Sequence, residues 1–160
     1  MLHSLLPIKE NMTYHYQTCG LENIYLLNGF REMEYAGEIA ISIHDLSGLH
    51  RAITHSLVNK PERLSGREFR FLRLEMDLSQ AELGKLFGVS DQAIAKWEKE
   101  QSRISTPAEL LIRAYAEDKV LDHSGRVAEL LEKLAKSDRK GIGKLEFHET
   151  NQGWKPAIAA

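Results

Sequence analysis

The spacing of apolar and polar positions changes once along the chain. Between residues 13 and 43 apolar residues alternate with polar ones, as in TYHYQT and EIAISIH, which predicts short β-strands. From residue 66 to about residue 118 apolar residues recur every three or four positions, which predicts a series of short helices. The pattern therefore predicts an α+β protein with a small β-rich module at its N-terminal end.

The N-terminal part carries two further signals. Asn28-Gly29 predicts a hairpin turn, because both residues tolerate a positive φ. A helix is expected just after Asp45, which can cap it, and before Pro61, which ends it. NKPERLSG then has the composition of a linker. The helix is predicted from the apolar positions Leu46, Leu49, Ile53 and Leu57.

These patterns divide the chain into three regions. Residues 1–65 are expected to form an α+β module that binds a partner or dimerises, residues 66–120 a helical domain, and residues 121–160 a C-terminal helix and tail. Residues 1–12 show little periodicity. Whether translation starts at Met1 or at Met12 stays open.

The C-terminal region contains one amphipathic helix followed by a break. In KGIGKLEFHET the glycines end the helix, and residues 144–148 alternate as in a short strand. The tail from Asn151 is expected to be loosely held. Whether the strand completes a sheet of its own subunit or of a second copy stays open. The helix is predicted from Val127, Leu130, Leu131 and Leu134, at i, i+3, i+4 and i+7.

LSQAELGKLFGVSDQAIAKWEKE, residues 78–100, describes two short helices and a turn. Ser79 can cap the helix 80–87, with Glu82 three residues later as in a capping box. Gly88 stands where a left-handed residue is required after a helix, and Ser90 can cap a second helix, 91–99. Neither helix is long enough to be stable alone.

The two helices need further helices to cover their apolar faces. The first is expected to bury Ala81, Leu83, Leu86 and Phe87, and the second Ala93, Ile94 and Trp97. A preceding helix supplies Phe69, Leu72 and Met76, and a following one begins with Pro107 in its first turn. On the outer face of the second helix lie Asp91, Gln92, Ala95, Lys96 and Lys99.

This arrangement, with its glycine-containing turn, is that of a helix-turn-helix. SQAELGKLFGVSDQAIAKWE closely resembles the Xre/Cro/CI-type helix-turn-helix of bacterial and phage regulators, over about residues 66–117. The resemblance implies a lambda-repressor-like domain of four to five helices that binds DNA. It implies a phosphate contact for Gln80 and base-edge contacts for Ser90, Asp91, Gln92, Ala95 and Lys96, and Lys99 and Arg103 are expected to reach phosphate.

Some of these side chains suit contacts with DNA bases, and one does not. Gln92 can pair with adenine and Lys96 can donate to guanine, and four residues apart they share one face. The alternative is that both are ordinary solvated surface. Asp91 departs from the pattern because a carboxylate repels phosphate, and it is favoured as a stabiliser of the helix N-terminus. The resemblance also implies a buried structural ion pair between Arg73 and Glu98.

One helix-turn-helix covers too little DNA for high specificity, so we expect a homodimer on a palindromic operator in double-stranded DNA. The candidate dimer surface is the stripe Val127, Leu130, Leu131 and Leu134, with Leu110, Leu111 and Tyr115. The alternative is that this stripe only closes the core of the monomer.

The order of an N-terminal module and a helix-turn-helix resembles MqsA-type antitoxins, which implies a toxin protein as partner. That family's N-terminal module carries four zinc-binding cysteines, whereas this chain has only Cys19. Nearby histidines, His15, His44, His50 and His55, do not give a tetrahedral set, so no metal is expected. In a rival interpretation the chain is a stand-alone, ligand-responsive repressor, whose pocket would be lined by Tyr14, Tyr16, Tyr25 and Phe30, residues favoured as core.

Composition and the absence of known motifs exclude several functional classes but do not identify the function. The net charge is −2, so any positive surface for nucleic acid must be local. No apolar run reaches the roughly 18–20 residues that span a bilayer, no signal peptide is evident, and a single cysteine fits the cytoplasm. No phosphate-binding loop, dinucleotide fingerprint or zinc-protease motif occurs. The expectation is a cytoplasmic DNA-binding repressor, with no enzymatic activity, cofactor or membrane.

Overall fold

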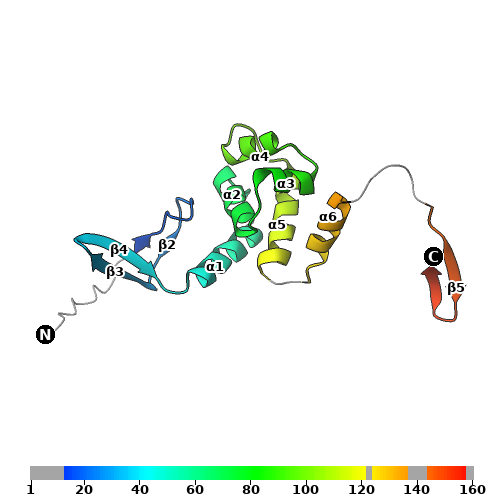
Figure 1. Ribbon diagram of the computed structural model, residues 1–160, viewed down its shortest axis with the longest axis horizontal. Coiled ribbons are helices and arrows are strands. Elements are labelled where there is room, and N and C mark those ends of the chain that lie inside the picture. Colours follow the sequence, from blue (N-terminus) through cyan, green and yellow to red (C-terminus); the bar gives the residue numbers. More distant parts are fainter. Residues whose placement is uncertain (1–12, 122–123, 137–143, 158–160) are drawn as a thin grey trace.

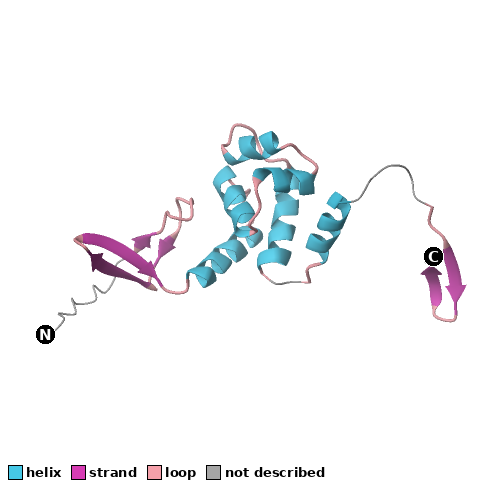
Figure 2. Ribbon diagram, in the orientation of Figure 1, coloured by secondary structure: helices cyan, strands magenta, loops and turns pink. Residues whose placement is uncertain are grey.

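A computed structural model describes residues 13–121, 124–136 and 144–157, and it shows an α+β protein as the sequence predicts (Figures 1 and 2). Met1, Met12 and the glycines 141 and 143 lie outside the described residues. The strands are β1 (Tyr14–His15), β2 (Tyr25–Leu26), β3 (Phe30–Tyr35), β4 (Glu38–Ile43), β5 (Phe147–Thr150) and β6 (Gly153–Pro156). The helices are α1 (Leu46–Asn59), α2 (Gly66–Glu75), α3 (Gln80–Phe87), α4 (Asp91–Glu98), α5 (Thr106–Val120) and α6 (Arg126–Lys136).

The strands form three antiparallel pairs, β1–β2, β3–β4 and β5–β6. The hairpin turn predicted at Asn28-Gly29 is in the wrong place, because β3–β4 closes at Ala36-Gly37, with φ of 54° and 82°. Gly29 lies instead at the open end of that hairpin, where its carbonyl accepts from the His44 amide at 2.8 Å. A two-residue turn with both φ positive matches the twist of the paired strands, and Ala36 adopts it despite its Cβ.

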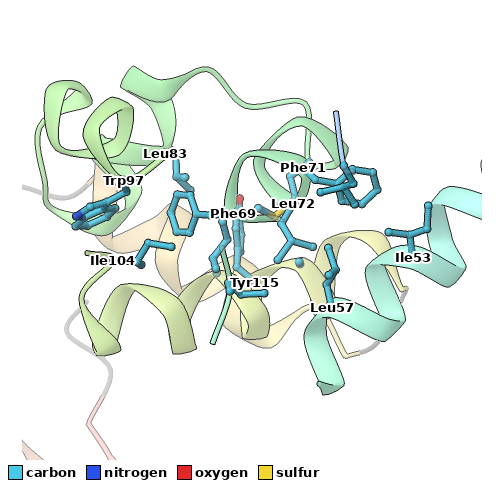
Figure 3. Close-up of a cluster of buried hydrophobic side chains, with 14 of the residues drawn as sticks. Ile53, Leu57, Phe69, Phe71, Leu72, Leu83, Trp97, Ile104 and Tyr115 are labelled. Atoms are coloured by element: carbon cyan, nitrogen blue, oxygen red, sulfur yellow. The ribbon is translucent and has the colours of Figure 1, made fainter. Parts of the chain in front are cut away.

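The helix α1 begins where the sequence predicts, with the Asp45 side chain accepting from the Gly48 amide at 3.1 Å. The sequence pattern groups α1 with the N-terminal strands, but its buried residues Ile53 and Leu57 join the hydrophobic core of the helices that follow. Figure 3 shows Ile53 and Leu57 projecting from α1 toward that core. The helical body therefore begins at α1 rather than at residue 66.

The segment 60–65 is a packed connection rather than the linker that the sequence suggests. The Arg113 guanidinium donates to two backbone carbonyls there, of Lys60 at 2.6 Å and Glu62 at 2.7 Å, and to those of Leu57 and Val58 at the end of α1. The Leu64 amide donates to Glu109 at 3.0 Å. Burial raises the pKa of Glu109, but the hydrogen bonds from Leu64 and Arg113 outweigh it and leave that pKa below its ordinary value.

The core lies between α1, α2, α3, α4 and α5 (Figure 3). Phe69, Leu72, Leu83, Ile94 and Ile112 are each 0% exposed, and the Phe69 and Trp97 rings meet edge to face with centroids 5.8 Å apart. The prediction that Phe69, Leu72 and Met76 are buried is confirmed. Ala81 is exposed, contrary to prediction, because α3 turns that position to solvent at its first turn.

The N-terminal part docks on the helices through the buried side chains of Tyr16, Leu21 and Leu26, which belong to the same hydrophobic core. The Tyr16 hydroxyl lies 2.9 Å from His50 Nε2, and His50 Nδ1 lies 2.6 Å from Glu75, so β1, α1 and α2 are joined. Tyr16 is buried, and burial raises the pKa of its hydroxyl. Tyr25 is not core as favoured above: it is 58% exposed and stacks on the His15 ring.

The C-terminal region is more ordered than the sequence suggests. The first turn of α6 is held by Asp118, which accepts from the amides of Val127 and Ala128 at 2.6 and 3.2 Å. The tail from Asn151, expected to be loose, includes β6, which pairs with β5 in a hairpin of its own chain. The strand that the sequence places at 144–148 begins at Phe147 and does not extend the N-terminal sheets.

Candidate nucleic-acid interface

The helix α3 is fixed at its start by the capping box that the sequence predicts. Ser79 Oγ accepts from the Glu82 amide at 3.1 Å, and the Glu82 carboxylate accepts from the Ser79 amide at 2.7 Å. These hydrogen bonds lower the pKa of Glu82, so the carboxylate stays charged at the positive end of the helix. The N-terminus of α3 is thereby held in one conformation.

The turn between α3 and α4 depends on Gly88. Its φ is 69°, which places it in the left-handed region that a residue with a Cβ adopts at a cost. The next amide, of Val89, donates to the Gly84 carbonyl at 2.9 Å. A Cβ at Gly84 would lie 2.6 Å from the Val89 carbonyl oxygen, so the absence of a side chain lets the turn close onto α3.

The second helix of the motif, α4, begins at the predicted cap. Ser90 Oγ accepts from the Ala93 amide at 3.1 Å. Ile94 and Trp97 are buried against α2 and α3, so the orientation of α4 about its own axis is fixed. The opposite face of the helix is therefore presented outward with little freedom to rotate.

The outward face carries the side chains that the sequence assigns to base reading. Gln92 and Lys96 are exposed, one helical turn apart, and among the described residues none pairs with the Lys96 ammonium. Ala95 is half-buried between them, and Ser90 is exposed although its hydroxyl accepts the cap bond. The structure therefore brings the predicted base-reading residues together on one face.

Asp91 is also exposed on this face, and its carboxylate is used locally. Oδ1 accepts from the Gln92 amide at 2.9 Å, at the first turn of α4. A carboxylate at this end of a helix stabilises it by favourable interaction with the helix dipole. The contact supports the helix-stabilising interpretation of Asp91 over a base contact.

Beneath this face lies a buried charge network. Arg73 Nε donates to Glu98 Oε1 at 2.6 Å and Arg73 Nη2 donates to Glu98 Oε2 at 3.0 Å. The two side chains are 8% and 4% exposed. Arg73 Nη1 also donates to the Leu78 carbonyl at 2.7 Å, which ties the turn before α3 to α2. The pair thus joins α2, the start of α3 and the end of α4.

Gln80 is a third member of this network, which the sequence did not reveal. Its side-chain Nε2 donates to Glu98 Oε2 at 2.8 Å, so part of the amide expected to contact phosphate points into the protein. An amide nitrogen carries two hydrogens, and the second can still donate outward. No spacing rule marks the contact, because Gln80 and Glu98 belong to different helices.

Lys99 and Arg103 lie beyond the end of α4. Lys99 is the C-cap of α4, and Arg103 lies in the loop before α5. Both side chains are exposed. With Gln80 and Lys96 they provide nitrogen donors on and beside α3 and α4, the arrangement that phosphate and base-edge contacts require.

The residues proposed for dimerisation divide between the core and the surface. Leu130 and Leu134 are 56% and 39% exposed, whereas Val127 is half-buried and Leu131 is half-buried against the core. Leu110 is 63% exposed and Leu111 is half-buried. Tyr115 is wrongly placed in the stripe, because it is 1% exposed and its hydroxyl donates to Glu132 at 3.0 Å.

No group of three or more potential metal ligands converges anywhere in the described ranges. Cys19 is a free, half-buried thiol. In those same ranges no helix combines the length and apolar character needed to cross a membrane.

Residues 69–111, which run from within α2 into α5, match the family model described as helix-turn-helix. No curated protein and no solved structure matches the chain. The match supports a DNA-binding transcriptional regulator, and residues 69–111 are a helix-turn-helix of the Xre/Cro/CI type.

Proposed function

We propose that this protein is a sequence-specific transcriptional repressor that inserts α4 into the major groove of its operator. The observation that carries the proposal is the outer face of α4, where Gln92 and Lys96 stand exposed on a helix fixed by buried Ile94 and Trp97. A helix held in one rotation presents the same side chains to every base pair it meets, which is a condition for direct readout.

The spacing on α4 matches the spacing of base pairs. Residues four apart are separated by about 6 Å along a helix axis, and successive base pairs lie about 3.4 Å apart along DNA. Gln92 and Lys96 would thus meet base pairs about two steps apart, with Gln92 suited to adenine and Lys96 to guanine. Gln80, Lys99 and Arg103 would contact phosphates on either side.

Two copies are needed for high specificity, and we propose a homodimer formed through α6. Leu130 and Leu134 are exposed there, close to charged neighbours that suit the margin of an interface. A two-fold dimer would place its two recognition helices about 34 Å apart, on successive major grooves of one face of a palindromic operator.

We further propose an antitoxin-like role, in which the N-terminal module binds a toxin protein and the dimer represses its own operon in the cytoplasm. Supporting this, the β3–β4 hairpin exposes Met33, Tyr35 and Ile39, which are 55%, 81% and 74% accessible. Among the strands that the structure describes, these two pair only with each other, so each offers an open edge to a partner.

The test is a fluorescence anisotropy titration of the whole protein against its own promoter fragment, with a scrambled fragment as competitor, at two salt concentrations. We expect tight binding that survives the competitor and weakens with salt. Gln92→Ala should reduce the preference for the promoter fragment, whereas Lys155→Ala, on the remote β5–β6 hairpin, should not. Equal affinity for promoter and scrambled fragments would refute sequence-specific repression at that site.

The second candidate is a stand-alone repressor that responds to a small molecule. An open pocket of about 640 Å³ at the base of the β3–β4 hairpin is lined by polar and apolar residues, among them Phe30, Arg31, His44 and Asp45. That volume lies within the range of small-molecule sites, roughly 300–1,000 Å³. A metabolite that changes operator affinity in wild type and not in Arg31→Ala would favour this candidate over a toxin partner.

A further inference from the structure

The β5–β6 hairpin has one apolar face and one polar face. Across the ladder Phe147 pairs with Pro156 and Glu149 with Trp154, so these side chains share a face, while His148 and Lys155 share the other. The Ala157 amide donates to the Glu146 carbonyl at 2.7 Å, which extends the ladder and brings Leu145 onto the apolar face. Glu149 stands beside the turn, at the margin of that face.

This apolar face is uncovered. Leu145, Phe147 and Trp154 are 81%, 57% and 71% exposed, and Figure 1 shows the hairpin clear of the helices. A two-stranded hairpin alone is marginally stable in water, and large exposed apolar side chains at one place mark an interaction surface. The hairpin therefore has an apolar surface that can bind another protein surface, and it would be stabilised by doing so.

We propose that the apolar face of β5–β6 packs face to face on the same face of a second copy of this chain, as a second dimerisation element beside α6. This rests on the homodimer of the proposed function. The hairpin follows α6 after residues 137–143. A two-fold axis beside α6 would relate the two hairpins as it relates the two helices, so the same face of each hairpin can meet its copy.

The exposed area supports a second copy as the occupant. Leu110, Leu130 and Leu134 offer roughly 300 Å² per protomer, well below the ~800 Å² per partner of a standard interface. The hairpin's three exposed side chains add roughly 400 Å², since large aromatic side chains bury about 150–250 Å² each. Together they approach what a stable dimer needs, and the three leucines alone do not. An isologous contact also lets one amphipathic face cover itself.

The test measures the dimer dissociation constant of the full-length protein by sedimentation equilibrium. Phe147→Glu places a charge on the apolar face, and His148→Glu, the next residue of the same strand, places one on the polar face. We expect Phe147→Glu to weaken the dimer at least tenfold and His148→Glu to change it less than twofold. Leu145→Glu, which lies before the paired residues of β5, should match Phe147→Glu without disturbing the ladder.

Tryptophan fluorescence gives an independent readout. Trp97 is 8% exposed and Trp154 is 71% exposed, so quenching by acrylamide reports mainly on Trp154. Quenching of the wild type should fall as concentration rises through the dimer dissociation constant, and that change should be absent in Leu145→Glu.

Three results would overturn the proposal. The first is a wild type that stays monomeric at high concentration, and the second is a dimer that Phe147→Glu and Leu145→Glu leave unchanged. In the third result Ile39→Glu, on the β3–β4 hairpin, weakens the dimer as much as Phe147→Glu, which would make β3–β4 of the second copy the occupant. A hairpin-dependent dimer that ignores the promoter fragment would support this inference while refuting the proposed function.

Discussion

Breaking the buried pair between Arg73 and Glu98 is expected to be among the most damaging single changes in the helical body. The side chains are 8% and 4% exposed, with N–O distances of 2.6 and 3.0 Å. Removing one partner leaves the other charge in a site that excludes water. The expected loss is about 3–5 kcal/mol of the free energy of unfolding, out of a total that is typically about 5–15 kcal/mol.

The loss is measured by urea unfolding followed by circular dichroism. With a urea dependence of about 2 kcal/mol per molar, Arg73→Met should lower the midpoint by roughly 1.5–2.5 M. The matched control is Arg67→Met on the same helix. Arg67 pairs with Glu22 at 2.8 Å, but those side chains are 58% and 65% exposed. The control should cost only about 0–1 kcal/mol, because water screens an exposed pair.

A double variant separates charge burial from lost packing. Arg73→Met with Glu98→Leu removes both charges and should be less destabilised than either single variant, with a coupling energy of about 2 kcal/mol or more. Additive losses, or a cost for Arg73→Met no larger than for Arg67→Met, would refute the reasoning. The same variants test Gln80, since Glu98→Leu releases its amide and should weaken DNA binding beyond any loss of folded protein.

Three further predictions concern the turn, the recognition helix and pH. Gly88→Ala should destabilise the protein by about 1 kcal/mol in urea unfolding, because φ is 69° there, and Gly88→Asn should cost less since asparagine tolerates that region; equal costs would contradict the backbone argument. Lys96→Ala should lose about 1–3 kcal/mol of operator affinity and relax preference at one base pair, and uniform weakening on all sequences would make it a phosphate contact. The pKa of Glu109 is below its ordinary 4.5, so its stabilisation is present above pH 4.5 and is lost as pH falls through the lowered value; Glu109→Gln should flatten the acid side of the stability–pH curve, and an unchanged curve would refute this.

The local features of the helix-turn-helix could be predicted because they depend on neighbours in sequence. Ser79, Glu82, Gly88 and Ser90 act within one or two turns, and the structure places each in its predicted capping role. Helix caps and left-handed residues are set by local backbone geometry, which single residue types reveal.

Contacts between distant elements could not be predicted in the same way. Nothing in the sequence shows that Gln80 donates to Glu98, or that Arg113 binds carbonyls about fifty residues earlier. The apolar stripe of α1 predicted a helix but not which helices cover it. The hairpin turn was misplaced because Ala36-Gly37 is a weaker signal than Asn28-Gly29, and strand pairing decides between them.

The carbonyls held by Arg113 have a mechanical consequence. The guanidinium fastens the end of α1 and the segment after it to α5, while Tyr16, His50 and Glu75 fasten β1 to α1 and α2. Residues 60–65 therefore do not act as a flexible hinge between β1 and α4. A protein bound at β1 would therefore keep one orientation relative to α4, and so relative to any DNA that α4 contacts.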